Sequence, residues 1–120
     1  MAKKQKILHY DFDKDSLNVW NIQFELWGHS VFGSNSLDVI NKELDSLSKY
    51  DVAVVSYCSN IDFHRGGGHS DLIKRLVSMN IPVIVTYCCD QYKSGNIVGV
   101  QFFERGSDDM TGLQKMIDTV

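Results

Sequence analysis

Acidic, hydroxyl and guanidinium side chains follow the apolar runs of this 120-residue chain, and these are the groups that could do chemistry. They are Asp11 and Asp13, then Ser56, then Thr86 or Tyr87, and finally Arg105. Carboxylate oxygens are suitable ligands for Mg²⁺, and a hydroxyl can both donate and accept a hydrogen bond. A guanidinium can bind phosphate or carboxylate through two parallel hydrogen bonds. Each group could belong to a functional site or could have a purely structural role.

The two acidic residues provide too few ligands to hold a metal ion permanently. Asp11 and Asp13 supply two carboxylates, and without a third ligand of that kind Mg²⁺ stays mostly hydrated, so both are weak Mg²⁺ candidates. A solvated loop is the simpler interpretation of both residues. We therefore predict no bound metal and no cofactor.

Ser56 has no evident base beside it, and a hydroxyl nucleophile needs one. A small residue that fills space at a strand end is the favoured interpretation, and we predict no enzymatic activity. Imidazole and thiol groups could bind Zn²⁺ nearby, but no CxxC pair or HxxxH helix supports a site. Those groups are Cys58, His64, His69, Cys88 and Cys89.

The glycine run 66–68 precedes a predicted helix, where exposed N–H groups could attract an anion. The run lacks the Lys and Ser or Thr spacing of a P-loop and the spacing of a dinucleotide fingerprint. We interpret it as a flexible loop.

Five apolar runs must position these groups. The continuous apolar character of 52–55 indicates a strand covered on both faces in a parallel sheet. We predict strands over 7–10, 30–33, 51–57, 81–86 and 98–103. Strands that alternate with helices predict a doubly wound α/β domain, in which reactive groups gather at the carboxyl edge of the sheet.

The helices follow from the spacing of apolar residues. The first is predicted from the N-cap Ser16 to a stop at Gly28, with Trp20, Phe24 and Trp27 in the core. The others are predicted after Asn35 or Ser36, near Ser70, and after Ser107 or Asp108. Because the segment 88–96 is polar, any helix there is expected to be short or irregular.

Composition limits the partners. Fifteen acidic and twelve basic side chains give a net charge of −3, which argues against nucleic-acid binding by this domain. No apolar run approaches the roughly 18 residues of a membrane span, so no membrane association is predicted. The odd number of cysteines implies no disulfide framework. We predict one cytoplasmic domain over residues 1–120.

The order of these features resembles the receiver domain of bacterial response regulators over nearly the whole chain, from residue 6 to residue 120. The segments that carry the resemblance are 7–11, 26–31, 51–55, 72–76 and 81–85. The resemblance implies a flavodoxin-like sheet with strand order 2-1-3-4-5 and a role in two-component phosphorelay signal transduction.

The chain departs from this family at the residues that the resemblance makes functional. A receiver carries two adjacent acids after its first strand, whereas Asp11 is followed by Phe12, with Asp13 one position further. The position of the phosphoacceptor aspartate matches Ser56, whose hydroxyl cannot form an acyl phosphate. The switch hydroxyl of the family matches Thr86 if one residue is deleted, or Tyr87 by direct count.

The lysine that receivers carry after their fifth strand matches Arg105, which keeps a positive charge. Gly106 replaces the proline that usually follows, so the cis peptide of the family is expected to be absent. With no Mg²⁺ or phosphate between them, Arg105 is expected to pair with Asp11 or Asp13.

The resulting prediction is a pseudo-receiver, a signalling domain that acts through protein contacts and lacks the phosphoacceptor aspartate. Its partner would be a signalling protein or its own output domain, and a homodimer would form through the face of the helix expected in segment 88–96, the fifth strand and the last helix. Two alternatives stay open: a conventional phosphate-accepting receiver with an unusual site, and a metal- or anion-binding sensor that uses the loops at Cys58, 66–68 and Cys88.

Overall fold

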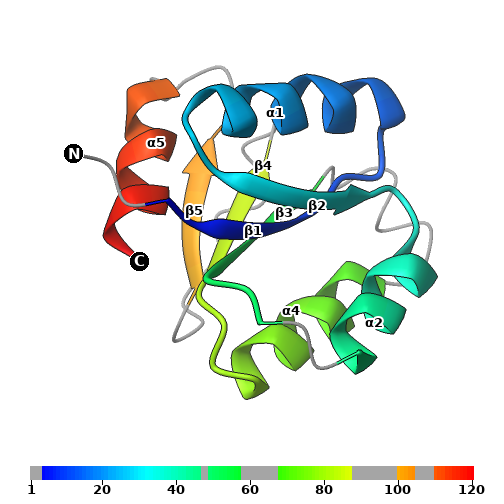
Figure 1. Cartoon of the computed structure of the whole chain (residues 1–120). Coiled ribbons are helices and arrows are strands. Elements are labelled where there is room, and N and C mark those ends of the chain that lie inside the picture. Colours follow the sequence, from blue (N-terminus) through cyan, green and yellow to red (C-terminus); the bar gives the residue numbers. More distant parts are fainter. Residues whose placement is uncertain (1–3, 47–48, 58–67, 88–99, 105–109) are drawn as a thin grey trace.

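The computed structural model describes residues 4–46, 49–57, 68–87, 100–104 and 110–120. Five parallel strands form one sheet in the order β2-β1-β3-β4-β5, which confirms the predicted topology (Figure 1). The strands are β1 (Lys6–Tyr10), β2 (Ser30–Ser34), β3 (Val52–Tyr57), β4 (Val83–Tyr87) and β5 (Val100–Glu104). The helices are α1 (Lys14–Leu26), α2 (Leu37–Asp45), α4 (Gly68–Ser78) and α5 (Met110–Thr119).

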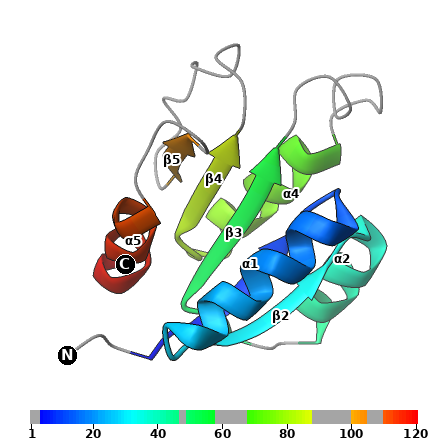
Figure 2. The same cartoon turned by 90° about the horizontal axis from the view of Figure 1, so that it is seen from above.

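The helices cover both faces of the sheet, as a doubly wound fold requires. Helices α1 and α5 lie on one face, and α2 and α4 lie on the other (Figures 1 and 2). Side chains of β1 alternate between the two layers: Ile7 belongs to the layer under α1 and α5, and Leu8 and Tyr10 belong to the layer under α2 and α4. The central strands are therefore buried on both sides.

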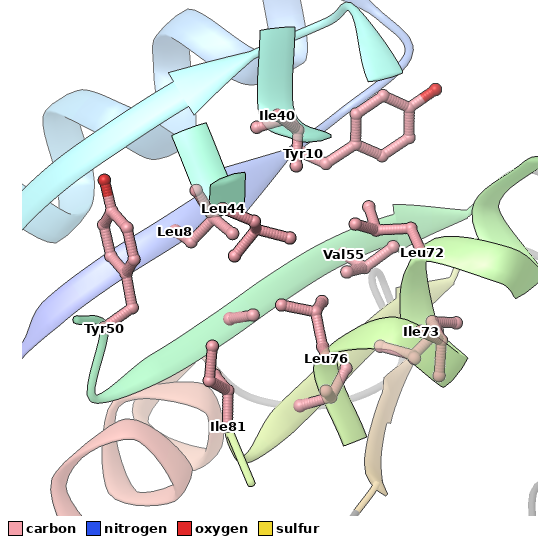
Figure 3. Packing of buried hydrophobic residues seen from close by; sticks show 13 residues of the cluster. Leu8, Tyr10, Ile40, Leu44, Tyr50, Val55, Leu72, Ile73, Leu76 and Ile81 are labelled. Atoms are coloured by element: carbon pink, nitrogen blue, oxygen red, sulfur yellow. The ribbon is translucent and has the colours of Figure 1, made fainter. Parts of the chain in front are cut away.

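The larger core lies between the sheet and helices α2 and α4. Figure 3 shows Leu8 and Leu44 close together in this layer, with Tyr10 and Tyr50 toward its two ends. Strands β3 and β4 add Val55, Val83 and Val85, all at most 1% exposed. The predicted continuous apolar character of these strands is explained by this double burial.

The predicted aromatic core of α1 is only partly confirmed. Phe24 is fully buried, and the rings of Trp20 and Trp27 lie 5.8 Å and 6.0 Å from it, but both tryptophans stay partly exposed. Gly28 ends the helix as predicted, with a φ of +94° that favours glycine. None of the described helices is long and apolar enough to span a membrane.

The beginning of α1 differs from the prediction. The N-cap is Asp13 rather than Ser16: its backbone is extended, its side chain accepts from the amide of Asp15, and its carbonyl accepts from the amide of Leu17. Both residue types can cap a helix. The turn between Asp11 and Asp13 directly after β1 makes the helix begin one turn before the predicted start at Ser16. Ser16 therefore lies in the first turn.

Strand bounds differ from the predictions by one to two residues. Strand β3 begins at Val52 rather than Asp51, and β4 runs from Val83 to Tyr87 rather than from Ile81 to Thr86. Strands β1 and β2 each gain one residue, Lys6 and Ser34. The predicted irregular segment 88–96 and the first two positions of the predicted fifth strand lie outside the described residues.

Candidate functional site

The parallel register places Ser56 of β3 directly beside Thr86 of β4, at the carboxyl end of both strands. Their hydroxyl oxygens lie 2.8 Å apart and share one hydrogen bond, in which either group can be the donor. Ser56 is 1% exposed and Thr86 is 2% exposed. The structure thus brings together two of the predicted site residues as a buried hydroxyl pair.

This pair has little intrinsic reactivity. A hydroxyl becomes a nucleophile when an adjacent base takes its proton, and the hydrogen bond of Ser56 goes to another hydroxyl. Tyr87 pairs with Tyr57 one step further along the register, so it does not stand opposite Ser56. The described geometry favours hydrogen bonding over group transfer.

Asp11 is fully buried, which corrects the expectation of a solvated loop. Its amide continues the sheet by donating to the carbonyl of Ser34 at 3.4 Å, so the residue is held against the strand ends. One carboxylate oxygen accepts from the amide of Asp13 at 3.0 Å and closes a tight turn. The structure therefore places a buried carboxylate at this edge of the sheet.

Asp13 is exposed, as the expectation of a solvated loop requires, and its side chain is used as the N-cap of α1. The two acids therefore have different roles and environments. Among the described residues, no group of three or more His, Cys, Asp or Glu side chains is arranged to hold a metal ion.

Several predicted site residues cannot be placed. Arg105 and Gly106, and with them the predicted ion pair and the predicted trans peptide, lie outside the described residues. The same holds for Cys58, His64, Gly66, Gly67, Cys88 and Cys89. Gly68 and His69 begin α4, and Tyr87 ends β4, but their side chains are not among those described.

Sequence reasoning missed a buried polar group next to the site. His9 of β1 is fully buried, and its Nδ1 lies 2.7 Å from Oδ1 of Asn21 on α1. The register sets His9 opposite Gly33 of β2, and an added Cβ at Gly33 would lie 2.6 Å from both terminal atoms of Asn21. Glycine therefore makes room for the asparagine. A histidine inside an otherwise apolar run was the available signal.

A second missed group lies at the opposite, amino-terminal end of β1. Gln5 is 1% exposed, and its side-chain amide donates to the carbonyls of Ile117 at 3.1 Å and Val120 at 3.2 Å. Its backbone amide donates to Nδ1 of His29 at 3.0 Å, and Nε2 of His29 lies 3.6 Å from Asp118. This cluster ties the end of α5 to the start of the sheet.

Tyr50, just before β3, lies at the same amino-terminal end. Burial, followed by a hydrogen bond to Glu43 and by the charge of that carboxylate, raises the pKa of the Tyr50 hydroxyl far above its usual value of 10.0. The Lys6 ammonium lies 4.9 Å from the centre of the Tyr50 ring. The side chain therefore stays protonated and joins α2 to the sheet.

Comparison with known proteins gives the fold. No family model and no curated protein matches the sequence. A response regulator receiver protein from Burkholderia phymatum matches with a TM-score of 0.73 and 15% identity, over 94% of this chain and 92% of that chain. The receiver domain of the hybrid histidine kinase CckA matches with a TM-score of 0.67 and 18% identity, over 93% and 94%. The chain has the fold of response-regulator receiver domains.

Proposed function

We propose that this chain is a receiver-like domain of two-component signal transduction that acts through protein contacts and does not accept phosphate. The fold supports the first part of the proposal, because the two receiver structures match it over more than nine-tenths of the chain. One observation carries the second part: Ser56, the next-to-last residue of β3, is buried, and its hydroxyl is bonded to Thr86.

The chemistry of this strand end supports the proposal. An acyl phosphate forms on a carboxylate, and the side chain at the end of β3 that the resemblance assigns to the acceptor is a hydroxyl. Phosphorylation of the hydroxyl instead would need a base and a metal to balance the charge of the incoming group. The described hydrogen bond of Ser56 goes to the hydroxyl of Thr86, which is neither a base nor a metal ligand set.

The acidic residues support the same conclusion. A Mg²⁺ ion needs oxygen ligands in near-octahedral array, with carboxylates facing one site. Asp11 is buried and bonded to a backbone amide, whereas Asp13 is exposed and caps α1. The proposal accordingly includes no metal cofactor and no enzymatic activity.

The proposed partner is another signalling protein or an output domain of the same protein, in the cytoplasm. The expected contact surface was the face that receivers use for dimers and partners, formed here by the helix predicted in segment 88–96, by β5 and by α5. Only β5 and α5 of that face belong to the described residues. A contact there stays a prediction.

The proposal is tested by NMR titration with Mg²⁺ and beryllofluoride, an analogue that binds the acceptor carboxylate as a phosphoryl group would. We expect no change in the amide signals of Ser56 and Thr86. The matched variant is Ser56→Asp, which places a carboxylate at the same strand end. Saturable shifts centred on Ser56 and Thr86 in the natural sequence would contradict the proposal and favour a conventional receiver with an unusual site.

A further inference from the structure

His29 lies buried between the residue that precedes β1 and the end of α5. It is 4% exposed, and its Nδ1 atom accepts a hydrogen bond of 3.0 Å from the backbone amide of Gln5. An imidazole nitrogen that accepts in this way carries no hydrogen, so the hydrogen of the neutral ring must be on Nε2. The contact with Gln5 therefore fixes one tautomer of this side chain.

The other ring nitrogen faces a carboxylate of α5. Nε2 of His29 lies 3.6 Å from Oδ1 of Asp118, which is longer than a hydrogen bond, and among the described residues neither of these buried atoms has a hydrogen-bond partner. The short polar contact of the neutral ring is therefore with Gln5. An imidazolium would favour Asp118 instead, because both of its nitrogens are donors and its charge is attracted by a carboxylate.

We propose that His29 is a pH-sensitive switch that exchanges one partner for another at the end of α5. Unprotonated His29 holds the backbone amide of Gln5. A proton added at Nδ1 points at the hydrogen of that amide, so this hydrogen bond breaks and the charged ring moves toward Asp118. The switch lies at the amino-terminal end of the sheet, and it does not depend on whether Ser56 accepts phosphate.

Gln5 transmits the effect of the proton to α5. Its side-chain amide donates to the carbonyls of Ile117 at 3.1 Å and Val120 at 3.2 Å, while its backbone amide is the donor to His29. One residue thus holds the end of α5 beside the start of β1 (Figure 1). Because a buried amide that loses its acceptor must find another, Gln5 has to shift when His29 is protonated, and its contacts with α5 loosen.

Asp118 is the charged side chain that acts on this switch. Among the described residues, it is the one that forms an ion pair with the His29 ring. The titratable His9 of β1 is bonded to Asn21 of α1. The other charged residues from position 4 through β1, in the last turn of α1 and in α5 are exposed, so solvent screens them. They are Lys4, Lys6, Glu25 and Lys115.

The test is an NMR titration of the chain from about pH 8 to about pH 5, the range in which imidazole changes its charge. At the alkaline end, the ring signals of His29 should show hydrogen on Nε2. As the ring is protonated, the backbone and side-chain amide signals of Gln5 should shift with the same midpoint, and the protection of its backbone amide against hydrogen exchange should fall at least about tenfold. Protonation of the ring without a change at Gln5, or a ring that stays neutral until the domain unfolds, would overturn the proposal.

Two variants test the two partners separately. His29→Asn can offer its side-chain oxygen to the Gln5 amide but takes up no proton in this range, so the Gln5 signals should lose their pH dependence. Asp118→Asn removes the charge that attracts the imidazolium, so half-protonation of His29 should need a proton concentration at least about threefold higher. Asp38→Asn, an exposed position on α2 across the sheet, is the matched control and should leave that midpoint unchanged (Figure 1). An unchanged midpoint in Asp118→Asn, or pH-dependent Gln5 signals in His29→Asn, would rule out the exchange of partners.

Discussion

The two ends of the sheet use buried polar groups differently. At the amino-terminal end, the side chain of Gln5 donates a hydrogen bond to Ile117 of α5, which is 112 positions away in the sequence. The backbone amide of Gln5 also donates to His29, just before β2. Among the described residues at the carboxyl end, Ser56 and Thr86 bond across adjacent strands, and Asp11 closes a turn with Asp13. Among the described residues, the amino-terminal end therefore joins the last helix to the sheet, whereas the contacts at the carboxyl end join neighbouring strands or close a turn.

This difference indicates at which end of the sheet a polar side chain can be substituted with less effect on the fold. In an open parallel sheet, the carboxyl ends of the strands form the functional edge. Near the end of β3, the described hydrogen bond of the Ser56 hydroxyl goes to Thr86 on the neighbouring strand β4. A change at Gln5 would instead detach a helix end.

The largest effect is expected for Gln5→Ala. The substitution removes two hydrogen bonds to carbonyls at the end of α5 and leaves a small cavity, so it should lower the free energy of unfolding by about 2–3 kcal/mol. Gln5→Met fills the space without a donor and separates the two contributions, with about 1–2 kcal/mol expected for the lost hydrogen bonds. Chemical denaturation measures both, and a change below about 0.5 kcal/mol for Gln5→Ala would remove the contrast between the two ends.

A smaller effect is expected at the carboxyl end. Ser56→Ala and Thr86→Val each leave one buried hydroxyl unsatisfied and should each cost about 1 kcal/mol of unfolding free energy. The double variant removes both partners, so it should cost less than the sum of the two. A double-mutant cycle gives this coupling, and strictly additive losses would show that the two hydroxyls do not pair.

Alkaline pH tests the amino-terminal end through Tyr50. Its pKa is raised in the folded protein, chiefly by burial and then by Glu43, so the unfolded chain releases this proton at a lower pH than the folded chain. The contribution of Tyr50 to stability is therefore fully present below about pH 10 and is lost as the pH rises further. Chemical denaturation between neutral and alkaline pH should show a smaller loss for Tyr50→Phe than for the natural sequence. Equal losses would mean that Tyr50 ionises as readily in the fold as outside it.

The smallest effect is expected for the predicted pair of Arg105 with an acid at the carboxyl edge. Because Asp13 is exposed, an ion pair with it contributes little, and its coupling should be about 1 kcal/mol or less; the cycle with the buried Asp11 tests the other predicted partner. Double-mutant cycles with alanine at each position separate this coupling from the packing of the individual side chains. Zero coupling in both cycles would show that Arg105 faces solvent or a partner.

Strands β3 and β4 could be predicted from sequence because they contain continuous apolar runs. Val52 to Val55 and Val83 to Val85 are buried on both faces, so nearly every residue carries the same signal. The start of α1 could not be fixed in this way, since Asp13 and Ser16 are both suitable caps. The choice follows from the turn that Asp11 closes, and that turn depends on the end of β1.

The resemblance placed Ser56 and either Thr86 or Tyr87 at strand ends. Only the register shows that the hydroxyls of Ser56 and Thr86 meet. The burial of Asp11 depends on its contact with Ser34 on another strand. The bond between His9 and Asn21 needs the space left by a glycine across the sheet, which no local pattern reveals.

The most direct test of the central claim is intact-mass spectrometry after incubation with acetyl phosphate and Mg²⁺. Because Ser56 near the end of β3 is bonded to Thr86 and offers no carboxylate at that position, we predict that the mass of the natural sequence does not change. Ser56→Asp provides the comparison with an acid at the same strand end. A stoichiometric gain of one phosphoryl group by the natural sequence, lost in Ser56→Ala, would contradict the account.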